Sequence, residues 1–305
     1  MSQPRPSLAQ DVLWRLEAAA YVVVFALLRL MDIETASALG GWLALRLGPL
    51  TGSHKVVQRN LRLAFPEMPA AEREALARAQ WDNLGRSTFE LPFMEELQPH
   101  RGRVQVVGAE RLEEIRRSGR PVVFISGHFS NWEVMPCAIV DAGIACQMTY
   151  RAANNVHVDK LIRDARARYG VRLFAPKGSD GSRELLTAMK RGESVALMND
   201  QKFNGGVAAP FMGHLAHTAA APSRLALRFG TVLQPMSVER LPRAHFRVIV
   251  HPPITLDDTG SRHTDLEAGV AKVNAFIEAQ VRARPLEWFW VHKRWSNAAY
   301  ASLKD

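Results

Sequence analysis

Short apolar segments alternate with amphipathic helical patterns along most of the chain. The apolar segments are rich in β-branched residues and predict buried strands at 104–107, 121–125, 144–150, 195–199, 232–238 and 246–250. Between them, apolar residues with helical spacing predict helices at 131–140, 157–169, 181–191, 218–229 and 265–284. No repeat, low-complexity tract or linker divides this region. The alternation predicts an α/β fold with a mostly parallel central sheet flanked by helices.

Two apolar stretches precede this alternation. The first, 18–28, has no charged residue, but Glu17 and Arg29 border it directly. It is therefore shorter than the stretch of about 20 residues that spans a bilayer. The second, 36–47, carries a single charge, and together the two predict an apolar helical hairpin that is embedded in a membrane or lies on one. Acidic residues follow the first stretch in place of a small-residue cleavage site, so we do not expect its removal as a signal peptide.

The next segment is basic and amphipathic. Val57 and Leu61 share one helical face, while Lys55, Arg59 and Arg62 lie on others. A helix of this kind suits an anionic bilayer surface. The alternative is that all three N-terminal helices cover the sheet of a soluble protein.

Composition narrows the class of protein. A hydrophobic content of 47% over 305 residues is enough for a sizeable core, which excludes a disordered chain. The net charge of +9 implies an acidic partner: a nucleic acid, an anionic membrane, a phosphorylated substrate or an acidic protein. A nucleic-acid-binding module is disfavoured, because the basic residues are spread over many helices and are not gathered with aromatic residues on one face. Cys137 and Cys146 fit no metal or redox spacing and are expected to be reduced core thiols.

The segment Gly127-His128-Phe129-Ser130-Asn131-Trp132-Glu133 joins a predicted strand to a predicted helix. His128 and Glu133 could not meet on a regular helix, because five positions rotate by roughly 500°. They can meet if His128 lies in the loop and Glu133 in the first helical turn. The carboxylate would then orient the imidazole as a general base. The alternative is a structural histidine beside a carboxylate that complements the helix dipole. The position at the carboxyl end of a strand, where open α/β sheets bind ligands, favours a site.

Two arginines, one in a predicted helix and one after a predicted strand, are further candidates. In the helix 157–169, neighbouring basic residues have an acidic residue four positions away, whereas Arg166 has none. Arg166 could therefore reach toward the sheet and hold a phosphate or carboxylate by two hydrogen bonds. Arg151 directly follows the strand that ends at Tyr150 and is a candidate for the same rim. The alternative for Arg166 is an ordinary basic residue on a solvated helix face.

Asp200 follows the strand 195–199 and so lies at the same expected edge of the sheet. It could orient a cation such as Arg166 or contact substrate hydroxyls; capping the following turn is the alternative. Near the C-terminus, three tryptophans stand among His292, Lys293 and Arg294. Tryptophan mixed with cations suits a bilayer interface or a structural cap, and we favour structure.

Taken in order, these segments resemble the bacterial lipid A late acyltransferases, the lauroyl/myristoyl branch within the lysophospholipid acyltransferase superfamily. The resemblance covers the apolar N-terminus, the His-x4-Glu segment, Tyr150-Arg151 with the Arg166 helix, Asp200-Gln201-Lys202, Pro210-Phe211-Met212-Gly213, Thr218, and Trp288-Phe289-Trp290-Val291-His292-Lys293-Arg294. His-x4-Glu alone is a weak signal, whereas the ordered set is specific. The chain departs at Met212, where the family often has a second aromatic residue.

The resemblance implies a glycerolipid acyltransferase-like fold, with a membrane-associated segment over 1–52 and an acyltransferase domain over 53–305. It implies transfer of a fatty acyl group from acyl carrier protein to a hydroxyl of a lipid A precursor, at the cytoplasmic face of the inner membrane. No metal or other cofactor and no nucleic acid is expected; the expected partners are acyl carrier protein, an anionic glycolipid acceptor and the membrane.

Matching the motifs assigns roles to the candidates. His128 becomes the general base, oriented by Glu133, with Arg166 and Asp200 as further site residues and Arg151 as a rim residue. Backbone N–H groups near Asn131 are candidate donors to the oxyanion. The alternatives are acyl transfer to another glycolipid or lysophospholipid, or a lipid or thioester hydrolase that uses the same dyad.

Overall fold

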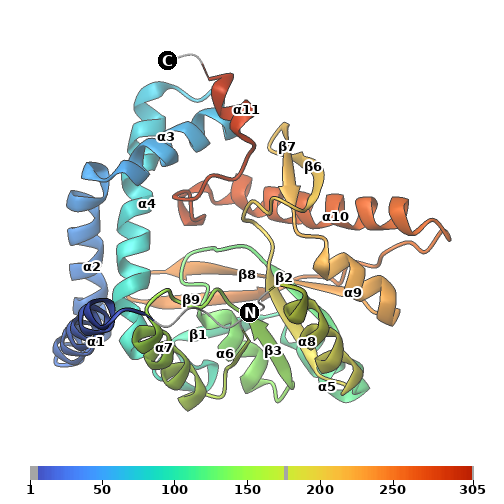
Figure 1. Ribbon diagram of the computed structural model, residues 1–305, viewed down its shortest axis with the longest axis horizontal. Helices are drawn as coiled ribbons and strands as arrows, with labels where there is room; N and C mark the ends of the chain where they lie inside the picture. The colour runs from blue at the N-terminus through green and yellow to red at the C-terminus, as the bar shows by residue number, and fades with distance from the viewer. Residues whose placement is uncertain (1–5, 175–177, 304–305) are drawn as a thin grey trace.

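The computed structural model describes residues 6–174 and 178–303, which form a central sheet, helices on both of its faces, and a separate group of helices at one side (Figure 1). The seven-stranded sheet has the order β1-β9-β8-β2-β5-β3-β4. Its strands are β1 (Val104–Val107), β2 (Val123–Ser126), β3 (Cys146–Thr149), β4 (Arg172–Phe174), β5 (Ser194–Met198), β8 (Leu233–Leu241) and β9 (His245–Val250). Neighbouring strands are parallel except for β8 and β9. The prediction of a mostly parallel central sheet is therefore confirmed.

The helices that follow β1 lie on both faces of the sheet, and all but α10 and α11 connect one strand to the next. They are α5 (Ala109–Ser118), α6 (Val134–Asp141), α7 (Val156–Arg168), α8 (Gly178–Lys190), α9 (Ala221–Phe229) and α10 (Arg262–Ala283), followed by the short α11 (Asn297–Ala301). The chain moves in one direction across the sheet through β2, α6, β3, α7 and β4, and then returns through α8 to β5 and through α9 to β8. Because such crossovers are right-handed, α6 and α7 cover one face, and α8 and α9 cover the other.

This reversal of direction determines where a ligand can bind. The helix after β2 and the helix before β8 lie on opposite faces, so a crevice forms beyond the carboxyl ends of β2 and β5. The two strands are hydrogen-bonded neighbours, with Phe124 opposite Ala196. Residues that follow these strands, although far apart in the sequence, therefore meet at one edge of the sheet.

A group of four helices precedes the sheet: α1 (Leu8–Leu28), α2 (Ile33–Leu47), α3 (Gly52–Ala64) and α4 (Ala70–Glu90). The apolar stretches predicted as a hairpin are α1 and α2, but they do not pack along one another. Instead α2 runs along α4, and α1 packs against α7 (Figure 1). The hairpin is thus not confirmed. In α3 the predicted apolar face is buried, since Val57 and Leu61 are both 0% exposed.

Helix α1 leaves most of its apolar side chains outside the core. The exposed ones include Leu8, Val12, Leu13, Leu16, Val23 and Leu27. Nevertheless, no helix in the described part of the chain combines the length and the apolar composition needed to cross a bilayer.

Several elements differ from the sequence prediction. A two-stranded hairpin, β6 (Val207–Phe211) and β7 (His214–Thr218), precedes α9, so the predicted helix at 218–229 begins only at Ala221. Thr218 does not begin that helix: it is fully buried in β7, and its hydroxyl hydrogen-bonds the side chains of Asn274 and Arg294. The three-residue β4 and the polar α5 have too little apolar periodicity to be predicted.

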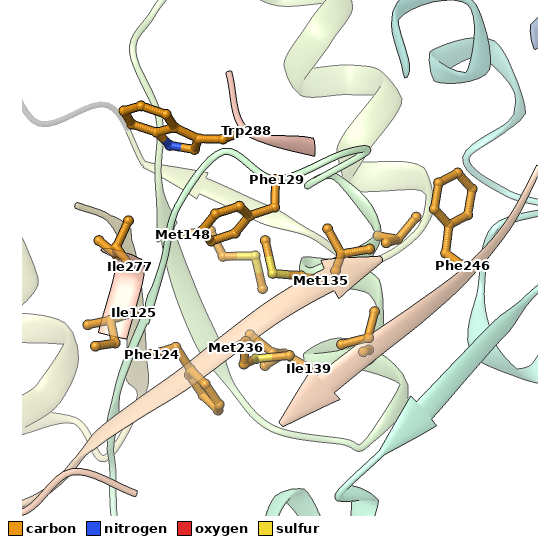
Figure 2. Packing of buried hydrophobic residues seen from close by; sticks show 14 of the residues in the cluster. Phe124, Ile125, Phe129, Met135, Ile139, Met148, Met236, Phe246, Ile277 and Trp288 are labelled. Atoms are coloured by element: carbon orange, nitrogen blue, oxygen red, sulfur yellow. The ribbon is translucent and has the colours of Figure 1, made fainter. Parts of the chain in front are cut away.

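Short 3-10 turns complete the chain at Gly48–Leu50, Leu91–Phe93, Pro99–Arg101 and Pro285–Glu287. The last of these turns leads into the C-terminal tryptophans. Trp288, Trp290 and Trp295 are 3%, 0% and 0% exposed, so the structural interpretation of this segment is confirmed. In Figure 2, Phe129 lies between Trp288 and the core methionine Met148.

The close packing of α2 on α4 depends on glycine. A Cβ atom on Gly40 would lie 2.4 Å from the carbonyl oxygen of Gly85, where no real side chain fits. We predict that Gly40→Ala lowers the free energy of unfolding by about 1–3 kcal/mol, the usual cost of overpacking. Gly52→Ala, where nothing lies within 4 Å, is the control and should be near neutral. Equal urea denaturation midpoints for the two variants would contradict the prediction.

Candidate active site

His128 and Asp200 form the centre of the candidate site, in the crevice beyond β2 and β5. The imidazole Nδ1 lies 2.7 Å from Oδ1 of Asp200. Oδ2 of the same carboxylate accepts the backbone N–H of His128 at 2.8 Å and the indole N–H of Trp288 at 2.8 Å. Asp200 is only 3% exposed. A carboxylate acceptor at Nδ1 fixes the proton there, which leaves Nε2 free to accept a proton.

The electrostatics of this pair follow from its burial. Burial alone lowers the pKa of His128, but the charge of Asp200 and their hydrogen bond raise it by more, so the pKa lies above its ordinary value of 6.5. Burial raises the pKa of Asp200, yet the interactions with His128 and Trp288 outweigh this and lower it. Asp200 therefore remains an anion that stabilises a proton on His128.

The predicted hydrogen bond between His128 and Glu133 is wrong. Glu133 ends the loop immediately before α6, and its carboxylate accepts two hydrogen bonds from Arg166: one from Nε at 2.8 Å and one from Nη2. Among the options considered for Asp200, the pairing with Arg166 is wrong, since Arg166 pairs with Glu133 and Asp200 with His128. The charge of Glu133 still contributes to raising the pKa of His128, so the two pairs are electrostatically linked.

The ion pair of Glu133 and Arg166 is itself largely buried, with side chains 12% and 18% exposed. Burial lowers the pKa of Arg166, but the Glu133 carboxylate raises it further, and the guanidinium stays charged. Tyr21 of α1 lies close enough for its own pKa to respond: burial raises it, while Arg166 lowers it. Helix α1 thus borders the site.

Asn131 and Arg151 occupy different settings. Asn131 is 1% exposed, and its side-chain amide donates to Glu90 of α4 at 2.9 Å, so that amide points into the protein. Arg151 is exposed and has no hydrogen bond or ion pair within the described residues. Burial and the charge of His128 are the main causes that lower the pKa of His292, and the charge of Arg151 lowers it further. Arg151 is therefore within electrostatic range of the site.

Aromatic residues of the 127–133 segment and of the C-terminal segment surround His128, in contacts that the sequence did not reveal. The Trp132 ring stands edge-on to His128, with centroids 5.0 Å apart, and the Phe289 ring lies 6.0 Å away. The Phe289 N–H donates to the backbone carbonyl of His128 at 3.1 Å. His292 packs against Phe289 at 5.0 Å. For Phe289 and His292 the sequence signal was the unusual density of tryptophan near the C-terminus, whereas Trp132 belongs to the 127–133 segment itself.

An apolar cavity adjoins the site between α6 and the sheet. It is lined on the helix side by Met135 and Ile139 and on the sheet side by Met148, Met198 and Ser126, among others. Ser126 and Met198 stand two positions before His128 and Asp200 in the chain. No group of three or more His, Cys, Asp or Glu side chains within 6–174 and 178–303 is placed to hold a metal ion.

Comparison with known proteins shows extended similarity. The family model described as bacterial lipid A biosynthesis acyltransferase matches residues 7–297. The lipid A biosynthesis lauroyltransferase of Escherichia coli (strain K12) is 26% identical, over 94% of this chain and 89% of its own length. The myristoyltransferase of the same organism is also 26% identical, over 83% and 77% respectively. The crystal structure of the 1-acyl-sn-glycerophosphate acyltransferase from Thermotoga maritima aligns with 81% of this chain and 95% of its own, with 14% identity and a TM-score of 0.39.

The site geometry predicts the titration of His128. Because Asp200 is the main cause that raises its pKa, Asp200→Asn should lower that pKa clearly, and Glu133→Gln should lower it less. Titration of 15N-histidine-labelled protein by NMR measures both shifts. A larger shift in Glu133→Gln than in Asp200→Asn would show that the pairing is reversed.

Proposed function

The chain belongs to the bacterial lipid A biosynthesis acyltransferases, and we propose that it transfers a fatty acyl group from acyl carrier protein to a hydroxyl of a lipid A precursor. Family membership supports acyl transfer in lipid A biosynthesis. The observation that carries the mechanism is the buried carboxylate of Asp200 on Nδ1 of His128, which leaves Nε2 as the acceptor of a proton.

His128 acts as the general base in this proposal. Nε2 takes the proton of the acceptor hydroxyl as its oxygen attacks the thioester carbonyl, and Asp200 stabilises the imidazolium that forms. The carbon–sulfur bond then breaks and the thiolate leaves with the proton from His128. No acyl-enzyme is needed because a thiol is a good leaving group. Since the pKa of His128 is raised, transfer should lose rate as the pH falls toward and below that raised pKa.

Donors to the oxyanion are available beside the base. The backbone N–H groups of Asn131, Trp132 and Glu133 have no hydrogen-bond partner among the described residues. We assign the oxyanion to this helix start, where unpaired N–H groups and the helix dipole favour negative charge. Arg166, held by Glu133, and the exposed Arg151 are the proposed contacts to the anionic acceptor.

The apolar cavity has a volume of about 60 Å³, so in this proposal it takes only the few methylene groups of a fatty acyl chain next to the reacting carbonyl, where an alkyl chain needs an apolar environment. The net charge of +9 suits an acidic carrier protein and a phosphorylated lipid. Residues 53–305 form the proposed acyltransferase domain, and 1–52 the proposed membrane-associated segment.

We place the protein at the cytoplasmic face of the inner membrane. Helix α1 presents exposed leucines and valines, which are expected to enter the boundary between headgroups and acyl chains. The helix is tied to α7 by Asp11, which hydrogen-bonds His157 at 2.8 Å, and by Asn155, which donates to the Trp14 carbonyl at 2.8 Å. Membrane contact through α1 would therefore bring a lipid next to the site.

The mechanism predicts that His128→Ala abolishes transfer without unfolding the protein. The assay combines purified protein, acyl carrier protein loaded with laurate or myristate, and a lipid A precursor, and detects the product by mass spectrometry. His263→Ala, an exposed histidine on α10, is the control and should transfer normally. Normal transfer by His128→Ala would refute the mechanism. Fatty acid release without an acceptor would favour a hydrolase, and product from a lysophospholipid alone would favour a different acceptor.

The membrane proposal predicts that full-length protein floats with vesicles that contain phosphatidylglycerol. Leu16→Glu together with Val23→Glu should prevent flotation, because both side chains are exposed on α1, at 63% and 56%, and charge disfavours insertion. Leu215→Glu on β7, where the wild-type side chain is 62% exposed, is the matched control and should still float. Wild-type protein that stays in solution at low salt would refute the proposal.

A further inference from the structure

A buried carboxylate outside the catalytic pair connects the N-terminal helices to the loop that carries His128. Glu90, at the end of α4, is 0% exposed. Its Oε1 accepts the hydroxyl of Ser37 from α2 at 2.7 Å, and its Oε2 accepts the side-chain amide of Asn131 from the loop at 2.9 Å. Three separate segments of the chain therefore meet at one carboxylate.

Arg240 of β8 neutralises this carboxylate and fixes its orientation. The guanidinium donates to Oε1 at 2.5 Å and to Oε2 at 3.0 Å. Its other N–H groups donate to the Asn83 side-chain oxygen and the Ser87 hydroxyl of α4, each at 2.8 Å. With this many short bonds, neither charged side chain can rotate without leaving a buried polar group unpaired.

The same arginine also supports the loop from a second side. Its backbone N–H donates to the carboxylate of Glu287 at 3.0 Å, and the backbone carbonyl of Glu287 accepts the N–H of Ser130 at 2.6 Å. Two successive loop residues, Ser130 and Asn131, are thus held by this cluster. Ser130 has a φ of 46°, a conformation that a non-glycine residue keeps only when its surroundings fix it.

Stability alone does not explain the arrangement. A buried ion pair can often be replaced by apolar residues without loss of stability, because the desolvation penalty offsets the attraction between the charges. What an apolar replacement could not do is accept a directed hydrogen bond from Asn131. That bond fixes the middle of a loop whose ends carry His128 and Glu133.

We propose that Glu90 is a positioning residue for acyl transfer: held by Arg240, it fixes Asn131 and thereby the loop between His128 and Glu133. The proposal rests on the proposed function for its link to acyl transfer. Glu90 itself does not touch the reacting atoms. Its effect on the rate comes from holding His128 and the helix-start N–H groups in place, where a displacement of about 1 Å can cost roughly 100-fold.

The test compares two hydrogen bonds to the same carboxylate. Asn131→Ala removes the bond to the loop, and Ser37→Ala removes the bond to α2; the two wild-type side chains are almost equally buried, at 1% and 2% exposed. Both variants should lose a similar amount of thermal stability. Only Asn131→Ala should lower kcat, by roughly 10- to 100-fold, with a smaller change in KM for the acceptor. Ser37→Ala should stay within about threefold of wild type.

A rescue experiment separates positioning from a structural role. Glu90→Gln replaces one carboxylate oxygen by an NH₂ group and removes the charge that holds Arg240, so the donors of Asn131, Ser37 and Arg240 compete for one oxygen and kcat should fall. Asn131→Asp in the Glu90→Gln background restores a donor and an acceptor with reversed polarity and should recover much of kcat. A double variant no faster than Glu90→Gln, or an Asn131→Ala variant no slower than Ser37→Ala, overturns the proposal.

A second measurement does not depend on the reaction. Hydrogen exchange of the full chain, followed by mass spectrometry, should show faster exchange of peptides covering 127–133 in Asn131→Ala and Glu90→Gln, but not in Ser37→Ala. Unchanged exchange in these peptides refutes the positioning role even if the wild-type protein proves inactive as an acyltransferase. An inactive wild type, together with the expected faster exchange in Asn131→Ala and Glu90→Gln, would instead refute the proposed function and support the positioning of the loop.

Discussion

The carboxylate of Asp200 is the contact on which the rest of the site depends. It lies beyond β5, accepts two hydrogen bonds from His128 beyond β2, and accepts a third from Trp288 in the C-terminal segment. A buried carboxylate must be paired and hydrogen-bonded to remain charged, so these bonds are required by its burial. The hydrogen bonds to Asp200 bring together the end of β5, the loop that carries His128 and the segment after α10 that carries Trp288. These bonds fix the position of His128.

The same requirement shapes two further carboxylates. Glu133 is paired with Arg166 of α7, and Glu90 with Arg240 of β8. Each pair joins the loop or its flanking helices to a different neighbour, so the segment 127–133 is fixed at its beginning, middle and end. This division explains why two acids near one histidine are not interchangeable: Asp200 holds the proton on Nδ1, whereas Glu133 keeps a guanidinium in place and acts on His128 only through its charge.

How well a feature could be predicted from the sequence depends on how far apart in the sequence its interacting residues lie. The strands β1, β2, β5 and β9 are short apolar runs with local boundaries, so their positions could be predicted from the sequence. The pairing of His128 depends on the order of strands in the sheet. Glu133 is close to His128 in the sequence, whereas Asp200 is close to it in space because β5 pairs with β2. No local sequence pattern encodes that pairing of strands. The sequence places Asp200 at the correct edge of the sheet, but the cation that it suggests as a partner is Arg166, whereas the observed partner is His128.

The N-terminal helices illustrate the same limit. Apolar composition located α1 and α2, but what each helix packs against is decided by complementary shape: Gly40 and Gly85 allow α2 to approach α4, and α1 is fastened to α7 by Asp11 and His157. Helix α7 therefore has two functions in the fold. It packs against the exposed apolar helix α1, and its Arg166 pairs with Glu133. A helix that contacts both the exposed apolar helix α1 and a buried ion pair near His128 supports the proposed reaction on a substrate that is partly lipid.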